Sequence, residues 1–420
     1  MQPLKQMSNP SSTPVHFYVN RPTGGVLKSV LKGLAILIAL IVAAGAYLWI
    51  FEQPHHSPPS QKMATIAPSG DATLDSIRKG IEYIRVHQES DGGFSKGILD
   101  PKPGFTAMAL DAIARSPDKL RDKDHPWMKK AAEKIISHQN KDGSISTPAF
   151  GLDTYTTAVS VMALVALENP AYQPAIDNAK KYLLDVQYRD DEETNMNFGA
   201  AGYTPGGRTS GDLTSLWVEA LKETGVKEGD PAFENARKFL SRLQNNPETN
   251  PTKEGKDWEI DTDGGLFYRP GESKPKDGVS KSGKRVLRSY GLMTYAGLKS
   301  FLYTKADKSD PRVQSAFKWA RENYTLDENR NIGPDGLFYY YMTMAKALAA
   351  YGEPIIETSD GQKREWAKEL SAKLVSLQDA DGSWKNKQSD RWKEDDAVLV
   401  TSFALRTLTI CHDEMKKTAK

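Results

Sequence analysis

One turn signature recurs along this chain at roughly fifty-residue intervals, and it constrains the fold more than any other feature. Its clearest copies read Gln-x-x-Asp-Gly-x-apolar and begin at Gln88, Gln139 and Gln378. Weaker copies follow three further positions: Gln187, which leads to Asn197-Phe198-Gly199, Gln244, which leads to Asp263-Gly264, and Asn323, which leads to Asp335-Gly336. Since a repeat of this length indicates a supersecondary unit, we expect six such units.

Each turn lies between two stretches of helical periodicity that differ in character. The stretches before the turns are amphipathic and charged, which suits an outer layer; examples are 74–87, 127–138 and 364–377. The stretches after the turns are almost entirely apolar or small, as in a helix buried on most sides; they are 105–114, 154–167, 286–303, 339–351 and 397–410. Gly after Asp takes the left-handed conformation at little cost. We therefore expect a structural role for the signature, with the Gln amide bound to backbone groups nearby.

This alternation predicts an all-α domain over residues 72–412, an α/α toroid of about six helical hairpins. A closed ring is favoured over an open solenoid because neither end of the array shows an obviously polar capping repeat. The Gln-x-x-Asp-Gly-x-Trp pattern at Gln378 to Trp384, together with the alternating helices, resembles the repeats of squalene and oxidosqualene cyclases and of protein prenyltransferase beta subunits. The resemblance implies an α6/α6 toroid, whose members share little mechanism.

The chemistry of these families is only partly represented in the residues. Triterpene cyclases protonate their substrate with an Asp-x-Asp-Asp motif, which this chain lacks. The nearest acidic strings are Asp261-Thr262-Asp263, on the fourth turn, and Glu394-Asp395-Asp396, at the start of the last apolar stretch. Asp395 and Asp396 are therefore the candidate catalytic acids if burial raises a pKa there. The alternative is that these acids only cap a helix.

Metal chemistry is not expected from this sequence. The zinc prenyltransferases of this fold use Asp, Cys and His ligands, and the single cysteine here, Cys411, has no matching Asp and His at the family's spacing. A single cysteine also excludes an internal disulfide. The Cys-Gly-Glu-Gln string of the thioester relatives is absent. We expect neither a metal nor another cofactor.

The candidate ligand-binding residues lie near the starts of the apolar stretches, which would surround one open end of the ring. They are Asp153, Tyr155, Asp212, Trp217, Arg288, Tyr290, Tyr339, Tyr340 and Tyr341. Aromatic faces stabilise a cation by roughly 0.5–2 kcal/mol each, and a few polar groups orient a ligand. The alternative is that the aromatic rings merely fill the interior. Two polar insertions, 202–211 and 268–283, are candidates for binding loops, and the first is interpreted as a flexible lid.

A further segment predicts attachment to a membrane. Residues 33–51 carry no charge, and at 1.5 Å per residue they extend roughly 28 Å, close to the thickness of a bilayer's hydrocarbon core. Residues 1–32 contain basic but no acidic side chains, which places them in the cytoplasm. Residues 52–71 are Pro-rich and predict a flexible linker, and 413–420 predict a tail. We thus expect a single-pass protein of the cytoplasmic (inner) membrane with a periplasmic toroid; a signal peptide cleaved after residues 44–46 is the alternative.

Composition narrows the functional classes. Lys and Arg number 56 against 54 for Asp and Glu, so no basic face is expected for nucleic acid. The first hypothesis is an enzyme or carrier for an apolar, isoprenoid-type ligand, and the second is a non-catalytic envelope scaffold that binds protein or glycan through the ring's mouth. A third, glycan cleavage, requires paired carboxylates, for which Asp153 and Asp212 are the candidate pair.

Overall fold

The computed structural model describes residue 64 and residues 66–94, 103–192 and 194–418. The expected cytoplasmic segment 1–32, the expected transmembrane segment 33–51 and most of the expected linker lie outside these residues. Of the helices in the described ranges, none combines the length and apolar character that a bilayer crossing needs. All the described residues belong to one compact unit.

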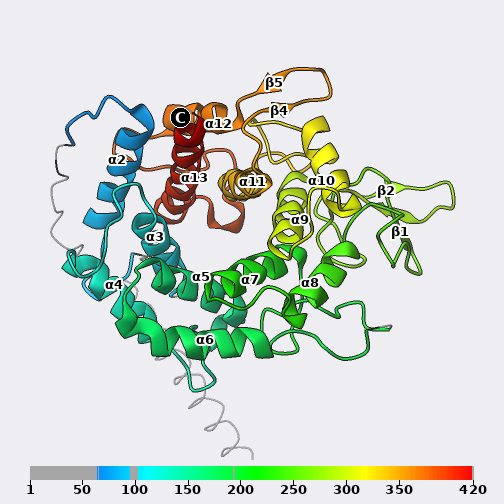
Figure 1. Cartoon of the computed structure of the whole chain (residues 1–420), viewed down its shortest axis with the longest axis horizontal. Coiled ribbons are helices and arrows are strands. Elements are labelled where there is room, and N and C mark those ends of the chain that lie inside the picture. The colour runs from blue at the N-terminus through cyan, green and yellow to red at the C-terminus, as the bar shows by residue number, and fades with distance from the viewer. Residues whose placement is uncertain (1–63, 65, 95–102, 193, 419–420) are drawn as a thin grey trace, which may run out of the picture. The chain divides into compact units, whose positions relative to one another are not determined.

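In the described part of the chain, twelve α-helices alternate between two layers (Figure 1). The outer helices are α2 (Ala72–Val86), α4 (Pro126–Ile136), α6 (Gln173–Asp185), α8 (Pro231–Ser241), α10 (Pro311–Glu322) and α12 (Trp366–Leu377). The inner helices are α3 (Gly104–Ala114), α5 (Asp153–Ala166), α7 (Gly211–Glu223), α9 (Gly291–Tyr303), α11 (Leu337–Tyr351) and α13 (Ala397–Thr418). The predicted α/α toroid is confirmed. The last helix continues to Thr418, beyond the boundary expected at residue 412.

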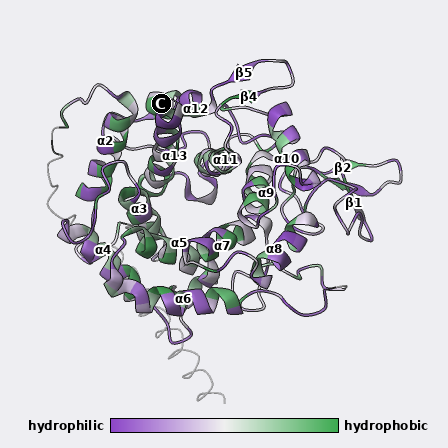
Figure 2. Cartoon of the chain, viewed as in Figure 1, coloured by the Kyte–Doolittle hydropathy of each residue, from purple (hydrophilic) through white to green (hydrophobic). Residues whose placement is uncertain are grey.

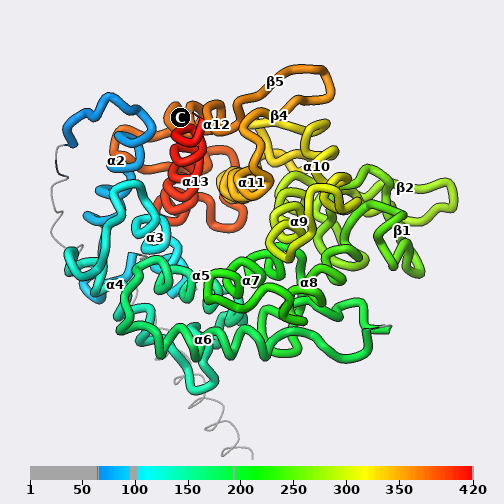
Figure 3. The backbone as a smooth tube through the Cα atoms, viewed as in Figure 1, coloured from blue at the N-terminus to red at the C-terminus, as the bar shows by residue number. Residues whose placement is uncertain are grey.

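Contacts between the last and first helices close the ring. Each inner helix packs against the next, and α13 packs against α3. In the outer layer, α12 likewise packs against α2 (Figure 3). No terminal repeat therefore needs a polar cap, which agrees with the sequence expectation of a closed array.

The distribution of hydrophobic residues along the helices differs between the two layers; Figure 2 colours each residue by its hydropathy. In the outer helix α4 the buried residues Met128, Ala131, Ala132 and Ile135 follow the spacing i, i+3, i+4, i+7, so a single stripe faces the inner layer. The inner helix α5 is instead buried at nearly every position from Thr156 to Leu164. An inner helix contacts both ring neighbours and the outer layer, so few of its faces can remain polar.

The Gln of the turn signature joins each turn to the next outer helix. The side-chain amide of Gln378 donates to the carbonyl oxygen of Gly382 in its own turn, at 2.9 Å, and to that of Ser76 in α2, at 3.0 Å. Four other copies make the same pair of bonds: Gln88 to Gly92 and Trp127, Gln139 to Gly143 and Ala175, Gln187 to Gly199 and Ala232, and Gln244 to Gly264 and Arg312. The fifth repeat departs from the pattern, since Asn323 donates to Trp319 within its own helix.

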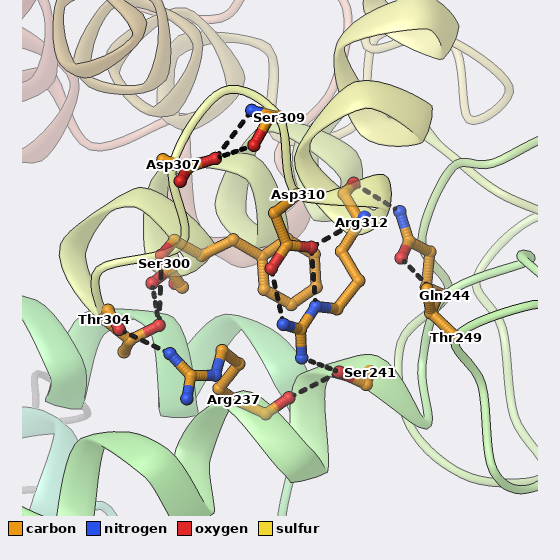
Figure 4. A network of polar contacts seen from close by, with 11 residues as sticks. Arg237, Ser241, Gln244, Thr249, Ser300, Thr304, Asp307, Ser309, Asp310 and Arg312 are labelled. Carbon is orange, nitrogen blue, oxygen red and sulfur yellow. Dashed lines mark hydrogen bonds and ion pairs between the residues drawn. The ribbon is translucent and has the colours of Figure 1, made fainter.

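Figure 4 shows the fourth of these junctions, between α8 and α10. The guanidinium of Arg312 is held by Asp310, at 2.8 and 2.5 Å, and lies 3.4 Å from the hydroxyl of Ser241 in α8. Because the carbonyl of the same arginine accepts the Gln244 amide, one residue ties the turn, α8 and the start of α10 together.

The glycine of the signature permits a close approach of two backbones. Gly382 has φ of +86°, and a Cβ placed on it would lie 2.7 Å from the carbonyl oxygen of Lys79 in α2. Gly92 has φ of +94°, and its Cβ would meet the carbonyl of Lys130 in α4 at 2.6 Å. Two constraints thus require glycine at each of these positions: the positive φ, and the lack of room for a Cβ atom beside the neighbouring carbonyl.

Two insertions add short strands to the helical ring. β1 (Trp258–Ile260) pairs in parallel with β3 (Arg285–Leu287), and β2 (Gly278–Val279) pairs antiparallel with β3. β4 (Ile356–Glu357) and β5 (Lys363–Arg364) form a second, antiparallel pair. The helix expected over 286–303 therefore begins only at Gly291, because Val286 and Leu287 complete a sheet. Three short 3₁₀ segments complete the elements: η1 (Pro148–Phe150), η2 (Pro170–Tyr172) and η3 (Arg391–Lys393).

Substitution of the signature glycine at the closing junction tests this account. Gly382→Ala should destabilise the folded protein by roughly 2–4 kcal/mol, because the left-handed conformation costs about 1 kcal/mol and the Lys79 carbonyl must also move. Gly361→Ala is the matched control: φ is +77° there, but no atom lies within 4 Å of the added Cβ, so it should cost only about 1 kcal/mol. Urea denaturation of both variants measures the difference, and equal losses would contradict the backbone contact.

Candidate functional site

A cavity of about 370 Å³ lies at the end of the ring where the inner helices begin. All six inner helices contribute residues from their first turns or from the residue just before them, so they run parallel and present their N-terminal ends to one chamber. Eight of the sixteen lining residues are aromatic: Phe105, Tyr155, Tyr203, Tyr268, Tyr290, Tyr339, Trp392 and Phe403. Three leucines add to the apolar wall, and four ionisable residues, Asp212, Lys274, Lys393 and Glu394, complete it with Gly336.

Asp212 is the carboxyl group most directly placed among the aromatic rings. It is the second residue of α7, whose N-cap hydroxyl, on Ser210, accepts the backbone N–H of Leu213 at 3.4 Å. Its Oδ1 atom is buried and has no hydrogen-bond partner among the described residues. Burial raises the pKa of Asp212 above its ordinary value of 3.8. Burial thus shifts the equilibrium of Asp212 toward its protonated form, relative to an exposed aspartate.

The two polar insertions bring further aromatic and basic groups over Asp212. Tyr203 comes from the insertion at 202–211, and Tyr268 and Lys274 come from the insertion at 268–283. The ammonium of Lys274 lies 3.6 Å from the centroid of the Tyr268 ring and 3.4 Å from Glu272. Burial lowers the pKa of Lys274. The insertions expected to carry binding residues thus do line the cavity.

Glu394 provides a second carboxyl group in the cavity wall. It is 1% exposed and precedes α13. Its Oε1 accepts the backbone N–H groups of Phe338 and Tyr339, at 3.0 and 2.9 Å, and its Oε2 accepts the amide of Asn386 at 2.7 Å. Burial raises the pKa of Glu394 to about 7, against these hydrogen bonds, which favour the ionised form. Glu394 thereby fixes the start of α11 against the segment that leads into α13.

The rim of the cavity contains strained backbone. Trp392 and Lys393 have φ of +57° and +64°, a conformation that costs about 1–3 kcal/mol for a non-glycine residue. Trp392 is 42% exposed, the most of any tryptophan among the described residues, and it lies against Gly336, where a Cβ would approach its ring to 2.7 Å. The segment is held by Arg391, which pairs with Asp335 at 2.7 Å. A tryptophan in strained backbone thus stands between the cavity and the solvent.

Beneath the aromatic cavity the ring interior is charged. Glu219 on α7 binds two ammonium groups, from Lys299 on α9 at 2.6 Å and from Lys346 on α11 at 2.7 Å. Burial alone would raise the pKa of Glu219, but the two lysines outweigh it and hold this pKa well below its usual range. Arg115 on α3 pairs with Asp111 at 2.6 Å and also with Glu223. These ion pairs connect four of the inner helices across the ring.

The structure brings together four of the nine candidate ligand-binding residues. Tyr155, Asp212, Tyr290 and Tyr339 line the cavity. The other five do not. The indole of Trp217 is buried and donates to the carbonyl of Leu183 in α6. The hydroxyls of Tyr340 and Tyr341 donate to the carbonyls of Thr325 and Leu326, respectively. Arg288 is exposed, and Asp153 begins α5 outside the cavity lining.

The two candidate catalytic acids also lie outside the cavity lining. Asp395 is exposed. Asp396 accepts the backbone N–H of Leu399 at 2.9 Å, as a helix-capping residue does. The neighbouring Glu394 is the acid of this string that faces inward, because the η3 segment turns the chain just before it. Residues 394–396 precede a helix, where successive side chains point in different directions, and the sequence alone does not reveal which one faces the cavity.

Several cavity residues were not identified from the sequence. Tyr203, Tyr268 and Lys274 lie in insertions whose sequence indicates only loops, and Trp392 lies between the sixth turn and α13. Phe105 and Phe403 belong to apolar helices that were interpreted as core. The available signal was the aromatic content of the insertions: a tyrosine within a Gly-rich polar loop has no local packing partner and must find one elsewhere.

Comparison with known proteins identifies the fold. No protein-family model matches the chain, and no curated protein matches it significantly in sequence. Among solved structures, the GH76A α-1,6-mannanase from Salegentibacter sp. HEL1_6 is 10% identical over 81% of this chain and 99% of its own, with a TM-score of 0.55. A family 76 glycoside hydrolase from a bovine Bacteroides thetaiotaomicron strain is 9% identical over 83% and 78%, with a TM-score of 0.52.

The type II terpene cyclase MstE from Scytonema, in complex with merosterolic acid A, is 11% identical over 82% of this chain and 98% of its own, with a TM-score of 0.47. The two glycoside hydrolases, both with a TM-score above 0.5, show the fold alone at these identities: the chain is an α/α toroid, as the sequence predicts.

The raised pKa of Glu394 predicts a pH dependence of stability. Its pKa is about 7 in the folded state and 4.5 ordinarily, so the folded state binds the proton more tightly. The contribution of Glu394 to stability is then complete below pH 4.5 and is lost as the pH rises through 7. Between pH 5 and pH 8 wild type should lose about 2–3 kcal/mol more than Glu394→Gln. Urea unfolding at both pH values measures this; Asp395→Asn should retain the wild-type dependence, and parallel curves for Glu394→Gln and wild type would contradict the assignment.

Proposed function

We propose that the aromatic cavity binds an apolar, isoprenoid-type ligand and that Asp212 is the proton donor for its conversion. The observation that carries this proposal is the buried Oδ1 of Asp212, which has no hydrogen-bond partner in the described part of the chain and lies in a chamber half lined by aromatic rings. A cavity of about 370 Å³ is within the range of small-molecule sites, which are mostly apolar with a few placed polar groups. This acid replaces Asp395 and Asp396, which lie outside the chamber.

The proposed chemistry follows from the arrangement of charge. The protonated Asp212 transfers its proton to one carbon of a ligand double bond, which forms a C–H bond and leaves a carboxylate and a carbocation. Aromatic faces around the chamber stabilise that cation by roughly 0.5–2 kcal/mol each. Loss of a proton from a neighbouring carbon to the Asp212 carboxylate regenerates the double bond and the acid. The apolar walls limit the access of water, which would otherwise capture the cation.

A second candidate, glycan cleavage, is favoured by one observation: Asp212 and Glu394 both line the cavity, so two carboxyl groups share one site. This pair replaces Asp153 and Asp212. Glu394 is, however, engaged by three hydrogen bonds from the surrounding fold, which suits a structural group better than a mobile acid. The isoprenoid proposal is therefore preferred.

The fluorescence of Trp392 reports whether a ligand enters the cavity. Geranylgeraniol, added to the purified full-length chain in a nonionic detergent, should reduce acrylamide quenching of tryptophan fluorescence, because it would cover the most exposed indole of the described residues. Trp392→Phe should remove the quenchable component of the tryptophan fluorescence.

Asp212→Asn should still bind the ligand and protect Trp392 from quenching. It should lower product formation, followed by mass spectrometry, by about 10²-fold or more. Asp395→Asn is the matched control and should convert as wild type does. An unchanged quenching curve, with no lipid co-purifying, would refute isoprenoid binding, and wild-type conversion by Asp212→Asn would refute the role of that acid.

We propose further that residues 33–51 anchor the protein in the cytoplasmic membrane with the toroid on the outer side. The support is the uncharged run of these residues and the basic segment before it. A reporter enzyme that is active only outside the cytoplasm should be active when fused after residue 420 and inactive when fused after residue 20. Deletion of 33–51 should release the chain from the membrane fraction. Activity of the reporter at residue 20 alone would contradict this orientation.

A further inference from the structure

A second cavity, of about 640 Å³, lies at the opposite end of the ring, where the inner helices finish. Lys346 and Arg406 form its inner wall, and both also line a small apolar pocket of about 30 Å³ that reaches up to Tyr155 and Tyr339 below the aromatic cavity. The basic pair thus sits on the axis of the ring, at the boundary between its apolar and charged layers.

Arg406 is a largely buried cation whose guanidinium makes no hydrogen bond within the described part of the chain. Its side chain is 16% exposed, and its Nε atom is buried without a hydrogen-bond partner. Its nearest carboxylate oxygen, Oδ2 of Asp111, lies 3.5 Å from Nε. Buried polar groups are ordinarily hydrogen-bonded, so such a guanidinium in a cavity wall requires an explanation.

The ion pairs around Arg406 leave its charge unbalanced. The central cluster contains three carboxylates and four cations: Asp111, Glu219 and Glu223 against Arg115, Lys299, Lys346 and Arg406. Glu219 is shared by two lysines, and Arg115 engages both Asp111 and Glu223 at close range. Among these four cations Arg406 therefore has the longest ion pair, 3.5 Å from Asp111. A buried charge is costly unless it is paired, so an external anion would stabilise this arrangement.

The acidic residues that line the cavity do not supply that anion. Asp413 is 60% exposed and lies 3.7 Å from the ring of His412. Glu414 is paired with Lys417 at 2.6 Å. Lys416 also lines the cavity and adds positive charge at its edge. The cavity thus leads from a mixed-charge rim to a basic inner wall.

We propose that Arg406, with Lys346 beside it, forms a binding site for an oxyanion, a carboxylate or phosphate group, at the C-terminal end of the ring axis. The planar guanidinium presents parallel N–H donors that match the two oxygens of such a group, and Lys346 adds a second cation. The site is separate from the aromatic cavity, so the proposal does not depend on the ligand or on the chemistry proposed there.

Calorimetric titration of the full-length chain in nonionic detergent tests the site, with inorganic phosphate as the probe and sodium chloride holding the ionic strength constant. Wild type should bind phosphate, and Arg406→Gln should weaken binding by about 10- to 100-fold, the loss expected for charge-assisted hydrogen bonds. Arg406→Lys keeps the positive charge but loses the parallel N–H donors of the guanidinium, so it should bind phosphate with intermediate affinity. Lys417→Gln removes a charge from the edge of the same cavity and should change the affinity less than about twofold.

Short-chain dihexanoyl phosphatidate in parallel titrations distinguishes a lipid head group from a free anion. Tighter binding of this lipid than of phosphate, lost in Arg406→Gln, supports the site with a lipid as its ligand; tighter binding of phosphate supports it with a free anion. Asp111 stays paired with Arg115 in Arg406→Gln, so this variant should fold, and circular dichroism checks that it does. No binding to wild type, or equal affinities for wild type, Arg406→Gln and Lys417→Gln, overturns the proposal.

Discussion

The ring depends on a repeated interaction in which one glutamine amide bridges two backbone carbonyls, one in its own turn and one in the next outer helix. The two N–H groups of a single amide satisfy both carbonyls, and each such hydrogen bond contributes about 1 kcal/mol. The junction is also dense, because the nearby glycine allows the turn to touch the neighbouring helix. Five of the six junctions in the described ring use this device. The junction between α10 and α12 lacks it, and there Arg321 instead binds the carbonyl of Glu357 in β4.

The interior held by these junctions has two layers of opposite character. At the N-terminal ends of the inner helices the walls are aromatic and burial raises the pKa of a carboxyl group, whereas further along the axis most carboxylates lie in close ion pairs. Burial acts on both layers, and the difference lies in the partners. Burial has the largest effect on the pKa of Asp212, while Glu219 has two ammonium groups within 2.7 Å. The same physical cost therefore raises the pKa of a carboxyl group in one layer, whereas in the other layer two lysines outweigh it.

The sequence was sufficient for the helical ring but not for the whole site. The Gln-x-x-Asp-Gly spacing and the apolar periodicity depend on local chemistry, so the repeat number and the layer of each helix could be predicted. Four cavity residues could be predicted for the same reason, because they lie at the starts of inner helices: Tyr155, Asp212, Tyr290 and Tyr339. Tyr203, Tyr268 and Trp392 reach the cavity from insertions whose course is decided by tertiary contacts. The choice of Glu394 over Asp395 depends on the backbone of η3, where two residues take positive φ, and no local preference predicts this.

Closure also removes any special status from the two ends of the ring. Asp71, which caps α2, lies 3.4 Å from His412 near the end of α13, so the first and last helices meet. A circularly permuted chain, with these ends joined by a short linker and new termini opened in the loop before another outer helix, would keep every interhelical junction. What would change is the order in which the hairpins are synthesised and the junction that must form last. The position of the chain termini in the ring therefore affects the order in which the hairpins fold. It does not affect the interhelical contacts that stabilise the folded ring.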